Sequence, residues 1–254
     1  MLNFAIETAR AAGHLLLEKF GRITSITKKG DINLVTEADL ASEALIIERV
    51  KSYYPKHSIL AEESGEAVVK GGDGAWKWII DPLDGTTNYA HGYPCFCVTL
   101  ALEHNEEIVV GVTYDPTREE LFAGEKGQGA TLNGKPIRVS AAEKLSESLV
   151  VTGFPYDFKS RPNFARHLTD FLLSSRGVRR DGSAAIDMAY VACGRFDGFW
   201  EEGLNPWDVA AGYLLIEEAG GHVSFYDGSN YSIYRPPIVA SNGLIHSQML
   251  DVLK

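Results

Sequence analysis

The sequence predicts a mixed α/β (α+β) fold in which sheets and helices stack as layers of one compact unit. Three observations support this prediction. Helical spacing occurs in two N-terminal segments, hairpin-like strands follow between residues 97 and 140, and strands alternate with helices from residue 148 onward. No repeat, low-complexity segment or evident linker separates these regions. Elements in this order bury their apolar faces against one another in stacked layers.

The N-terminal segments are expected to form two helices joined by a loop. Apolar residues recur at helical spacing from residue 2 to residue 20, and Gly21 provides a stop. The polar segment TKKGDINLVTEAD, which begins at residue 27, is expected to be loop-like until Thr36 opens a second helix. That helix is expected to run to about Val50.

Strands are expected next. SILAEES (58–64) predicts a short strand that ends in two glutamates, and WKWIID (76–81) predicts a second strand. A glycine-rich surface loop is expected between them. Two dipeptides then mark hairpins between strand-like runs, Asn105-Glu106 and Asn133-Gly134.

The second half of the chain alternates strands with helices. Strands are expected at 148–154, 177–180, 196–202, 222–226 and 236–242. Helices are expected at 161–175, 183–195, 206–221 and 243–253. The third of these helices has Pro206 near its start and Gly220-Gly221 at its end, as helix-start and helix-stop preferences require.

The composition excludes several classes of protein. The formal net charge is -10 over 254 residues, without a compensating basic run, so we expect no direct nucleic-acid binding and no attraction to anionic membranes. No apolar run approaches the ~20 residues that span a bilayer. The N-terminus lacks the basic-then-apolar order of a signal peptide, and a cytoplasmic protein is expected. An acidic protein that binds an anionic substrate needs metal ions to bridge the two.

The cysteines do not indicate a disulfide framework. There are three, Cys95, Cys97 and Cys193, an odd and small number for this length. The Cys95-Phe-Cys97 pair lies in a strand-like run and lacks a second cysteine pair. A reduced, buried structural role is therefore favoured over a metal site.

Carboxylates gather at the ends of predicted elements, where ligands usually bind in layered α/β folds. These residues are Asp39, Glu62, Glu63, Asp81, Asp84 and Asp208. Carboxylates brought together repel one another, and protons or hard cations relieve the repulsion. Mg²⁺ takes carboxylate, water and phosphate oxygens, so these residues predict a site for two or more Mg²⁺ ions.

Taken singly, each acid also has an ordinary structural explanation. The Asp81-Pro-Leu-Asp84 segment is equally well explained as a turn. Asp208 suits a first helical turn, where an acid complements the helix dipole. Thr36 and Asp39 resemble a capping box with Asp in place of Glu. Only the combination of these residues favours the metal site.

Gly85-Thr86-Thr87 follows the second aspartate. If a helix starts there, its free N–H groups favour a phosphate, and glycine lets the phosphate approach the backbone. The hydroxyl of Thr86 is placed to orient a water. Together with the acids, this segment indicates metal-assisted hydrolysis of a phosphomonoester.

Two long motifs resemble those of a known family. WIIDPLDGTTNYAH (78–91) resembles throughout the first signature of the inositol monophosphatase family of Mg²⁺-dependent, lithium-sensitive phosphatases. WDVAAGYLLIEEAGG (207–221) resembles the second. The segments DINLVTEAD, ILAEES and RRDGSAAIDMAYVACGRFDGFWE also resemble their family counterparts, in the right order. The resemblance spans nearly the whole chain and is specific at family level.

The resemblance implies a layered α-β-α-β-α sandwich of the sugar-phosphatase type and a homodimer. It implies a single domain over residues 1–254, in which 1–145 form a metal- and phosphate-binding half and 146–254 complete the substrate site. It also implies two or three Mg²⁺ ions and a small-molecule phosphate ester as substrate.

The resemblance further assigns roles residue by residue. The implied metal ligands are Glu62, Asp81, the backbone carbonyl of Leu83, Asp84 and Asp208. The implied catalytic residues are Thr86 and Asp39, which match the pair that activates the nucleophilic water, and Glu62. The implied substrate contacts are Asp84, Gly85, Thr86, Ala184 and Glu201. Glu63 matches a neighbouring acid, and Lys28 falls where the family has a lysine near the metals.

The expected function is Mg²⁺-dependent hydrolysis of myo-inositol monophosphate or a similar small sugar phosphate. One alternative keeps the chemistry and changes the substrate, since related phosphatases act on fructose 1,6-bisphosphate, histidinol phosphate, NADP or 3′-phosphoadenosine 5′-phosphate. Asn205 and Pro206 resemble bacterial members rather than animal ones, which leaves the substrate open. Another alternative is a regulatory protein that binds the transcription machinery, as some bacterial relatives do.

Overall fold

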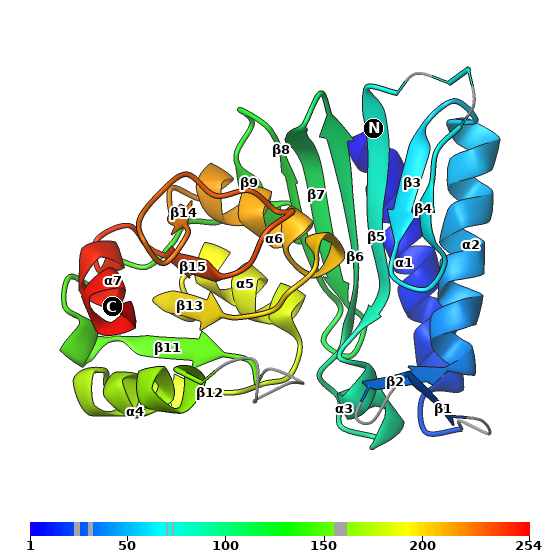
Figure 1. The fold of residues 1–254 in the computed structure, drawn as a ribbon. Coiled ribbons are helices and arrows are strands. Elements are labelled where there is room, and N and C mark those ends of the chain that lie inside the picture. Colours follow the sequence, from blue (N-terminus) through cyan, green and yellow to red (C-terminus); the bar gives the residue numbers. More distant parts are fainter. Residues whose placement is uncertain (23–25, 30–32, 70, 73, 155–161) are drawn as a thin grey trace.

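A computed structural model describes residues 1–22, 26–29, 33–69, 71–72, 74–154 and 162–254, and it describes the side chains of these residues except 26–29, 33 and 34. The described elements form five layers (Figure 1). Helices α1 (Leu2–Lys19) and α2 (Glu37–Tyr53) cover the outer face of an eight-stranded sheet. Helices α5 (Ala184–Ala192) and α6 (Pro206–Glu218) fill the space between this sheet and a five-stranded sheet. Helices α4 (Phe164–Ser174) and α7 (His246–Leu253) cover the far side, which confirms the predicted α-β-α-β-α sandwich.

Strand β5 (Trp76–Asp84) is the third strand from one edge of the eight-stranded sheet. In spatial order its strands are β10 (Lys135–Pro136), β9 (Ala130–Leu132), β8 (Glu120–Glu125), β7 (Glu107–Asp115), β6 (Cys97–His104), β5, β3 (Ser58–Ala61) and β4 (Gly65–Ala67). Neighbouring strands are antiparallel except β3 and β5, which run parallel. Because parallel strands point the same way, the residues that follow β3 and β5 emerge at one edge of the sheet.

The five-stranded sheet has the order β12 (Gly177–Arg179), β11 (Leu149–Thr152), β13 (Gly198–Glu201), β15 (Ile238–Ser241) and β14 (His222–Ser224). The β11 strand pairs in parallel with both β12 and β13, and β15 runs antiparallel to β13 and β14. Glu201 is the last residue of β13.

Alternating side chains of β5 explain why this strand lies between two layers of helices. Trp78 and Ile80 pack into the apolar core under α1 and α2, whereas Ile79 packs into the core formed with α5 and α6. All three are buried, because successive side chains of a strand point to opposite faces and both faces of this sheet are covered. The strand is thus held rigidly up to the aspartates at its end.

Most predicted elements are present, and the hairpin turns are confirmed. Asn105 and Glu106 have φ of 52° and 66°, and Asn133 and Gly134 have φ of 51° and 76°. Both pairs are left-handed, as two-residue hairpin turns of the favoured type require. The helices expected at 2–20 and from Thr36 onward correspond to α1 and α2.

Four predictions need correction. The polar segment from residue 27 is not only loop: β1 (Ile26–Lys29) and β2 (Asn33–Thr36) pair as an antiparallel ribbon. The predicted strand 58–64 ends at Ala61, so Glu62 and Glu63 lie in the turn after it. Part of the predicted glycine-rich loop forms the edge strand β4. The strand predicted to end at Asp81 continues to Asp84.

The continuation of β5 has a structural cause. Asp84 pairs with Cys97 of β6 beyond a register shift that follows Asp81. Pro82 lies inside this shift, where a strand residue needs no ladder hydrogen bond from its own nitrogen.

Among the described helices, none combines the length and apolar character that crossing a membrane requires.

Candidate active site

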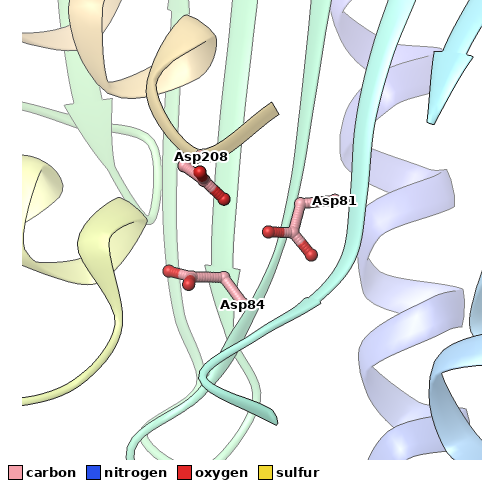
Figure 2. A group of neighbouring side chains, drawn as sticks. All are labelled: Asp81, Asp84 and Asp208. Atoms are coloured by element: carbon pink, nitrogen blue, oxygen red, sulfur yellow. The ribbon is translucent and has the colours of Figure 1, made fainter. Parts of the chain in front are cut away.

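Three aspartates meet where β5 ends and α6 begins (Figure 2). Asp81 and Asp84 come from β5, and Asp208 comes from the first turn of α6; their side chains point toward one another. One carboxylate oxygen from each of the three lies within 4.8 Å of the others. We call these three residues the acidic cluster.

Hydrogen bonds fix each member of the acidic cluster. Asp81 Oδ1 accepts from the backbone N–H of Leu83 at 3.0 Å. Asp208 Oδ2 accepts from the backbone N–H of Asn205 at 2.7 Å, as part of a capping box that starts α6. The ordinary helix-start explanation of Asp208 is therefore correct, but it leaves the other carboxylate oxygen available to the cluster.

The N-terminus of α5 holds the remaining aspartate. Asp84 Oδ2 accepts from the hydroxyl of Ser183 at 2.6 Å and from the backbone N–H of Ala185 at 2.8 Å. Ser183 is also the N-cap of α5. Burial raises the pKa of Asp84, and these hydrogen bonds oppose the rise.

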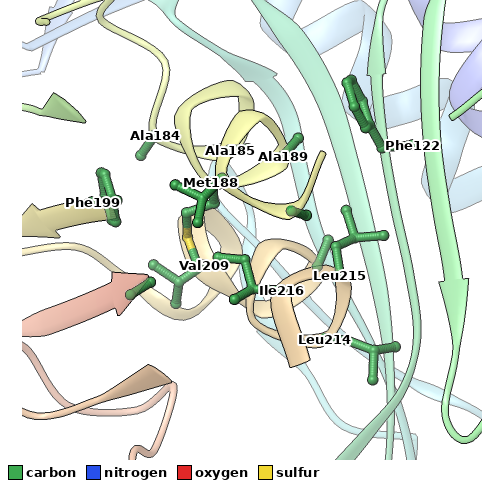
Figure 3. Packing of buried hydrophobic residues seen from close by; sticks show 14 of the residues in the cluster. Phe122, Ala184, Ala185, Met188, Ala189, Phe199, Val209, Leu214, Leu215 and Ile216 are labelled. Atoms are coloured by element: carbon green, nitrogen blue, oxygen red, sulfur yellow. The ribbon is translucent and has the colours of Figure 1, made fainter. Parts of the chain in front are cut away.

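Packing between α5 and α6 sets the position of both helix starts (Figure 3). Helices α5 and α6 approach closely at Gly212 of α6. A Cβ added to Gly212 would lie 2.6 Å from the Cβ of Met188 on α5. A Cβ at Gly111 of β7 would lie 2.9 Å from the backbone oxygen of Ala211. These close approaches leave no room for α6 to shift, so Asp208 is held over the end of β5.

The electrostatics of the acidic cluster favour a cation. Burial raises the pKa of Asp81 well above its usual range, and Glu62, Asp84 and Asp208 raise it further. Burial and the charge of Asp84 raise the pKa of Asp208 to about 7. Asp81 and these three neighbouring acids repel one another when they are ionised. A hard divalent cation prefers carboxylate oxygens as ligands, and its charge removes the repulsion. The residues present therefore fit the metal site that the sequence predicted.

Thr86 and Asp39 lie together beside this cluster. The hydroxyl of Thr86 is 3.0 Å from Asp39 Oδ1 and 3.0 Å from the carbonyl oxygen of Leu83. The other oxygen of Asp39 accepts from the backbone N–H and the hydroxyl of Thr36, at 2.8 and 2.5 Å. The capping box predicted from Thr36 and Asp39 is confirmed, and one oxygen of Asp39 remains for Thr86.

Gly85 joins the acidic cluster to the short helix α3 (Thr86–Ala90). Its φ is 93°, and a Cβ at this position would lie 2.8 Å from the backbone oxygen of Cys95. Both facts require glycine. The predicted helix after Asp84 is present.

A cavity of about 280 Å³ opens over the cluster. The residues that line it include Glu62, Asp81, Asp84, Thr86, Ala184, Glu201 and Asp208. The structure thus places the predicted site residues around one cavity, with two exceptions: Asp39 contacts it through Thr86, and Glu63 does not line it. The side chain of Lys28 lies outside the described residues.

Glu201 is buried, and its carboxyl group lies against Gly153, in space that any larger residue at position 153 would occupy. A Cβ at Gly153 would lie 2.1 Å from Oε1 of Glu201. Burial, and then the charges of Asp208 and Asp84, raise the pKa of Glu201 to about 8, while Arg180 opposes the rise. A protonated Glu201 both donates and accepts hydrogen bonds, which suits a substrate hydroxyl.

Two buried acids near the site were not predicted from the sequence. Asp187 lines the cavity, is 1 % exposed, and neither of its carboxylate oxygens has a hydrogen-bond partner among the described residues. Burial, then Asp181, Glu201 and Asp84, raise its pKa well above the usual range. The signal was one charged residue in the otherwise apolar segment SAAIDMAYVA. Glu43 is the second missed acid, and its only signal was an acid at helical spacing from Asp39.

Comparison with known proteins agrees with this geometry. The profile of the inositol monophosphatase family matches residues 1–253. The chain is 47 % identical to an inositol-1-monophosphatase of Synechocystis sp., over 99 % of this chain and 88 % of that protein. It is 44 % identical to the Nus factor SuhB of Escherichia coli strain K12, over 98 % of this chain and 94 % of that protein.

The fold agrees as well. The structure of inositol monophosphatase from Anabaena (Nostoc) sp. superposes with a TM-score of 0.89 at 48 % identity, covering 99 % of this chain and 94 % of that one. With the family profile matching almost every residue, and with relatives well above 30 % identity along the full length, this chain belongs to the inositol monophosphatase family.

Proposed function

We propose that this protein hydrolyses a small phosphomonoester in the presence of Mg²⁺, and that myo-inositol monophosphate is its preferred substrate. The observation that carries the proposal is the acidic cluster of Asp81, Asp84 and Asp208 at the base of a cavity, with the Thr86–Asp39 pair beside it. Membership in the inositol monophosphatase family and the name of the Synechocystis relative favour this substrate.

Two or three Mg²⁺ ions would be held by Glu62, Asp81, the Leu83 carbonyl, Asp84 and Asp208. Bound Mg²⁺ supplies neutralisation of the phosphate charge and makes a nearby water more acidic. The chain itself supplies metal ligands in fixed positions, because backbone N–H groups hold the three aspartates before any ion binds. Such preorganisation reduces the reorganisation that accompanies reaction.

Thr86 and Asp39 would orient the attacking water. A hydroxyl has one proton to donate, so Thr86 donates to Asp39 or to the Leu83 carbonyl at any moment. Its lone pairs then accept a hydrogen bond from the water. Burial raises the pKa of Asp39, although the hydrogen bonds from Thr36 and Thr86 oppose this, and a raised pKa makes a carboxylate a better proton acceptor.

The substrate would lie in the cavity, with its phosphate and its alcohol held by different residues. Backbone N–H groups at Gly85 and Thr86 would hold the phosphate. Asp84, the backbone of Ala184 and the buried Glu201 would contact hydroxyl groups of the leaving alcohol. This arrangement favours a compact polyol such as inositol, because carboxyl groups that accept hydrogen bonds discriminate between alcohols by their hydroxyls.

A substrate panel tests the proposal. The purified protein is assayed with Mg²⁺ against inositol monophosphate, fructose 1,6-bisphosphate, histidinol phosphate, NADP and 3′-phosphoadenosine 5′-phosphate, with and without lithium. We expect the highest kcat/KM on inositol monophosphate, and inhibition by lithium. Equal or better rates on fructose 1,6-bisphosphate would reassign the substrate, and no Mg²⁺-dependent hydrolysis of any ester would refute the proposal.

A second role is compatible with one observation: relatives that cover this chain include the protein named Nus factor SuhB. A regulatory contact with the transcription machinery is therefore the alternative function. A pull-down with RNA polymerase and Nus factors, using wild type and Asp81→Asn, separates the two roles. Binding retained by the inactive variant supports a regulatory role, and its absence from both proteins removes it.

Three further properties stay predictions. We propose that residues 1–254 form one domain, because α5 and α6 contact both sheets. We propose a homodimer, which light scattering of the purified protein tests. We propose a cytoplasmic location, which cell fractionation tests.

A further inference from the structure

Three polar residues share one face of helix α2. Asp39, Ser42 and Glu43 are spaced by three and four positions, which places them side by side on a helix. Asp39 and Ser42 are fully buried, and Glu43 is 5 % exposed. Buried polar side chains are costly unless they are hydrogen-bonded, so their partners show what this face is for.

Each of the three residues contacts a different segment of the site. Asp39 holds Thr86 at 3.0 Å. The hydroxyl of Ser42 donates to the carbonyl of Pro82, between the two aspartates of β5, at 2.8 Å. Glu43 Oε2 accepts from the backbone N–H of Glu63 at 2.9 Å. One rigid helix thereby sets the relative positions of the β5 end, the Thr86 segment and the turn after β3.

The contact made by Glu43 acts on Glu62. The backbone N–H of Glu62 donates to the carbonyl of Ile80 in β5 at 3.3 Å. The next N–H along the chain, that of Glu63, donates to Glu43. Glu62 therefore lies between two fixed peptide groups, one held by β5 and one held by α2. The β3–β4 pairing of Ala61 with Gly65 closes the two ends of this turn, and the bond to Glu43 fixes the peptide group inside it.

We propose that Glu43 is a positioning residue that sets the direction in which Glu62 approaches the acidic cluster. Its carboxylate accepts one hydrogen bond, aligns the peptide after Glu62, and so raises the affinity for the divalent cation. The inference rests on the proposed function to the extent that Glu62 is a metal ligand. Residues that orient metal ligands change metal affinity by about 10–100-fold when they are removed.

Four variants test this role. Glu43→Gln keeps an oxygen that accepts from the backbone N–H of Glu63 but removes the charge. Glu43→Asp keeps the charge but shortens the side chain. Glu43→Ala removes the accepting oxygen and the charge. Glu48→Ala, at an exposed position of the same helix, is the matched control. Each protein is titrated with Mg²⁺ by calorimetry, and the Mg²⁺ concentration for half-maximal activity, kcat at saturating Mg²⁺ and Tm are measured.

We expect Glu43→Ala and Glu43→Asp to weaken Mg²⁺ binding by about 10-fold or more, in the calorimeter and in the activity titration alike. We expect kcat at saturating Mg²⁺ to change by no more than about 3-fold, since the ligands themselves are intact. Glu43→Gln and Glu48→Ala should bind Mg²⁺ as wild type does. If Glu43→Ala does not fold, the Gln and Asp variants give the same comparison.

Two results would overturn the inference. Unchanged Mg²⁺ affinity in Glu43→Ala or Glu43→Asp would show a role in stability alone, and weakened affinity in Glu43→Gln would show that charge, not position, matters. The proposed function has its own control. If wild type and Asp81→Asn bind Mg²⁺ equally, the metal site itself is wrong, whatever the Glu43 variants do.

Discussion

Replacing Glu201 by glutamine should stabilise the metal-free protein at neutral pH. Burial and the nearby aspartates raise the pKa of Glu201 from 4.5 to about 8. The folded state then holds a proton that the unfolded chain has released, so stability is full below about pH 4.5 and is lost as the pH rises toward 8. At pH 7 the gap corresponds to about 3 kcal/mol, at 1.36 kcal/mol per pH unit. Glutamine does not titrate, has the same shape, and removes this loss.

Urea unfolding in EDTA measures the effect. We expect Glu201→Gln to exceed wild type by about 1–3 kcal/mol at pH 7, and to match it near pH 4.5. For a chain of this size, that gain corresponds to a rise in Tm of several degrees. Glu48→Gln, at an exposed position on α2, is the control and should change neither value. A stability difference that is absent at pH 7, or equal at both pH values, would refute the reasoning.

Four other changes test the remaining parts of the site. Asp81→Asn should lower kcat by several orders of magnitude with the fold intact, and near-normal turnover would contradict the metal assignment. Thr86→Val should lower kcat about 10²-fold or more while Thr86→Ser retains most of it; equal rates in both variants would remove the hydroxyl from the mechanism. Gly153→Ala should raise KM more than it lowers kcat, because its Cβ would lie 2.1 Å from Glu201 Oε1; unchanged kinetics would exclude Glu201 as a substrate contact. Mg²⁺ affinity should rise from pH 6 to pH 8 in calorimetric titrations, because Asp208, with a pKa of about 7, must lose its proton to bind the ion; a flat profile would place the metal elsewhere.

Much of the secondary structure could be predicted from the sequence, because helical spacing, turn residues and helix caps depend on residues that are close together in the chain. Helical spacing predicted α1, and the left-handed turn residues at 105–106 and 133–134 predicted two hairpins. Thr36 and Asp39 predicted the capping box of α2, which depends on residues three positions apart. The candidate site residues could also be predicted from the sequence, because acids at the ends of several elements and the two long motifs favour a metal site in combination.

The exact ends of strands depended on partners that lie far away in the chain. Strand β5 continues past Pro82 because β6 pairs with Asp84 across a register shift. The segments β1 and β2 look polar and loop-like alone, and they become strands by pairing with each other. Pairing of this kind is a tertiary event, so a pattern within one segment does not reveal it.

The sequence by itself predicted which residues carry the chemistry, whereas the tertiary structure decided how they are held. Asp208 and Asp84 meet because α6 packs against β7 through glycine, a contact between segments distant in sequence. Packing of α5 against α6 buries Asp187, and packing of α2 against β5 buries Glu43; no local pattern marked either as a site residue. Burial and pKa depend on every layer that surrounds a side chain, and only the folded chain brings those layers together.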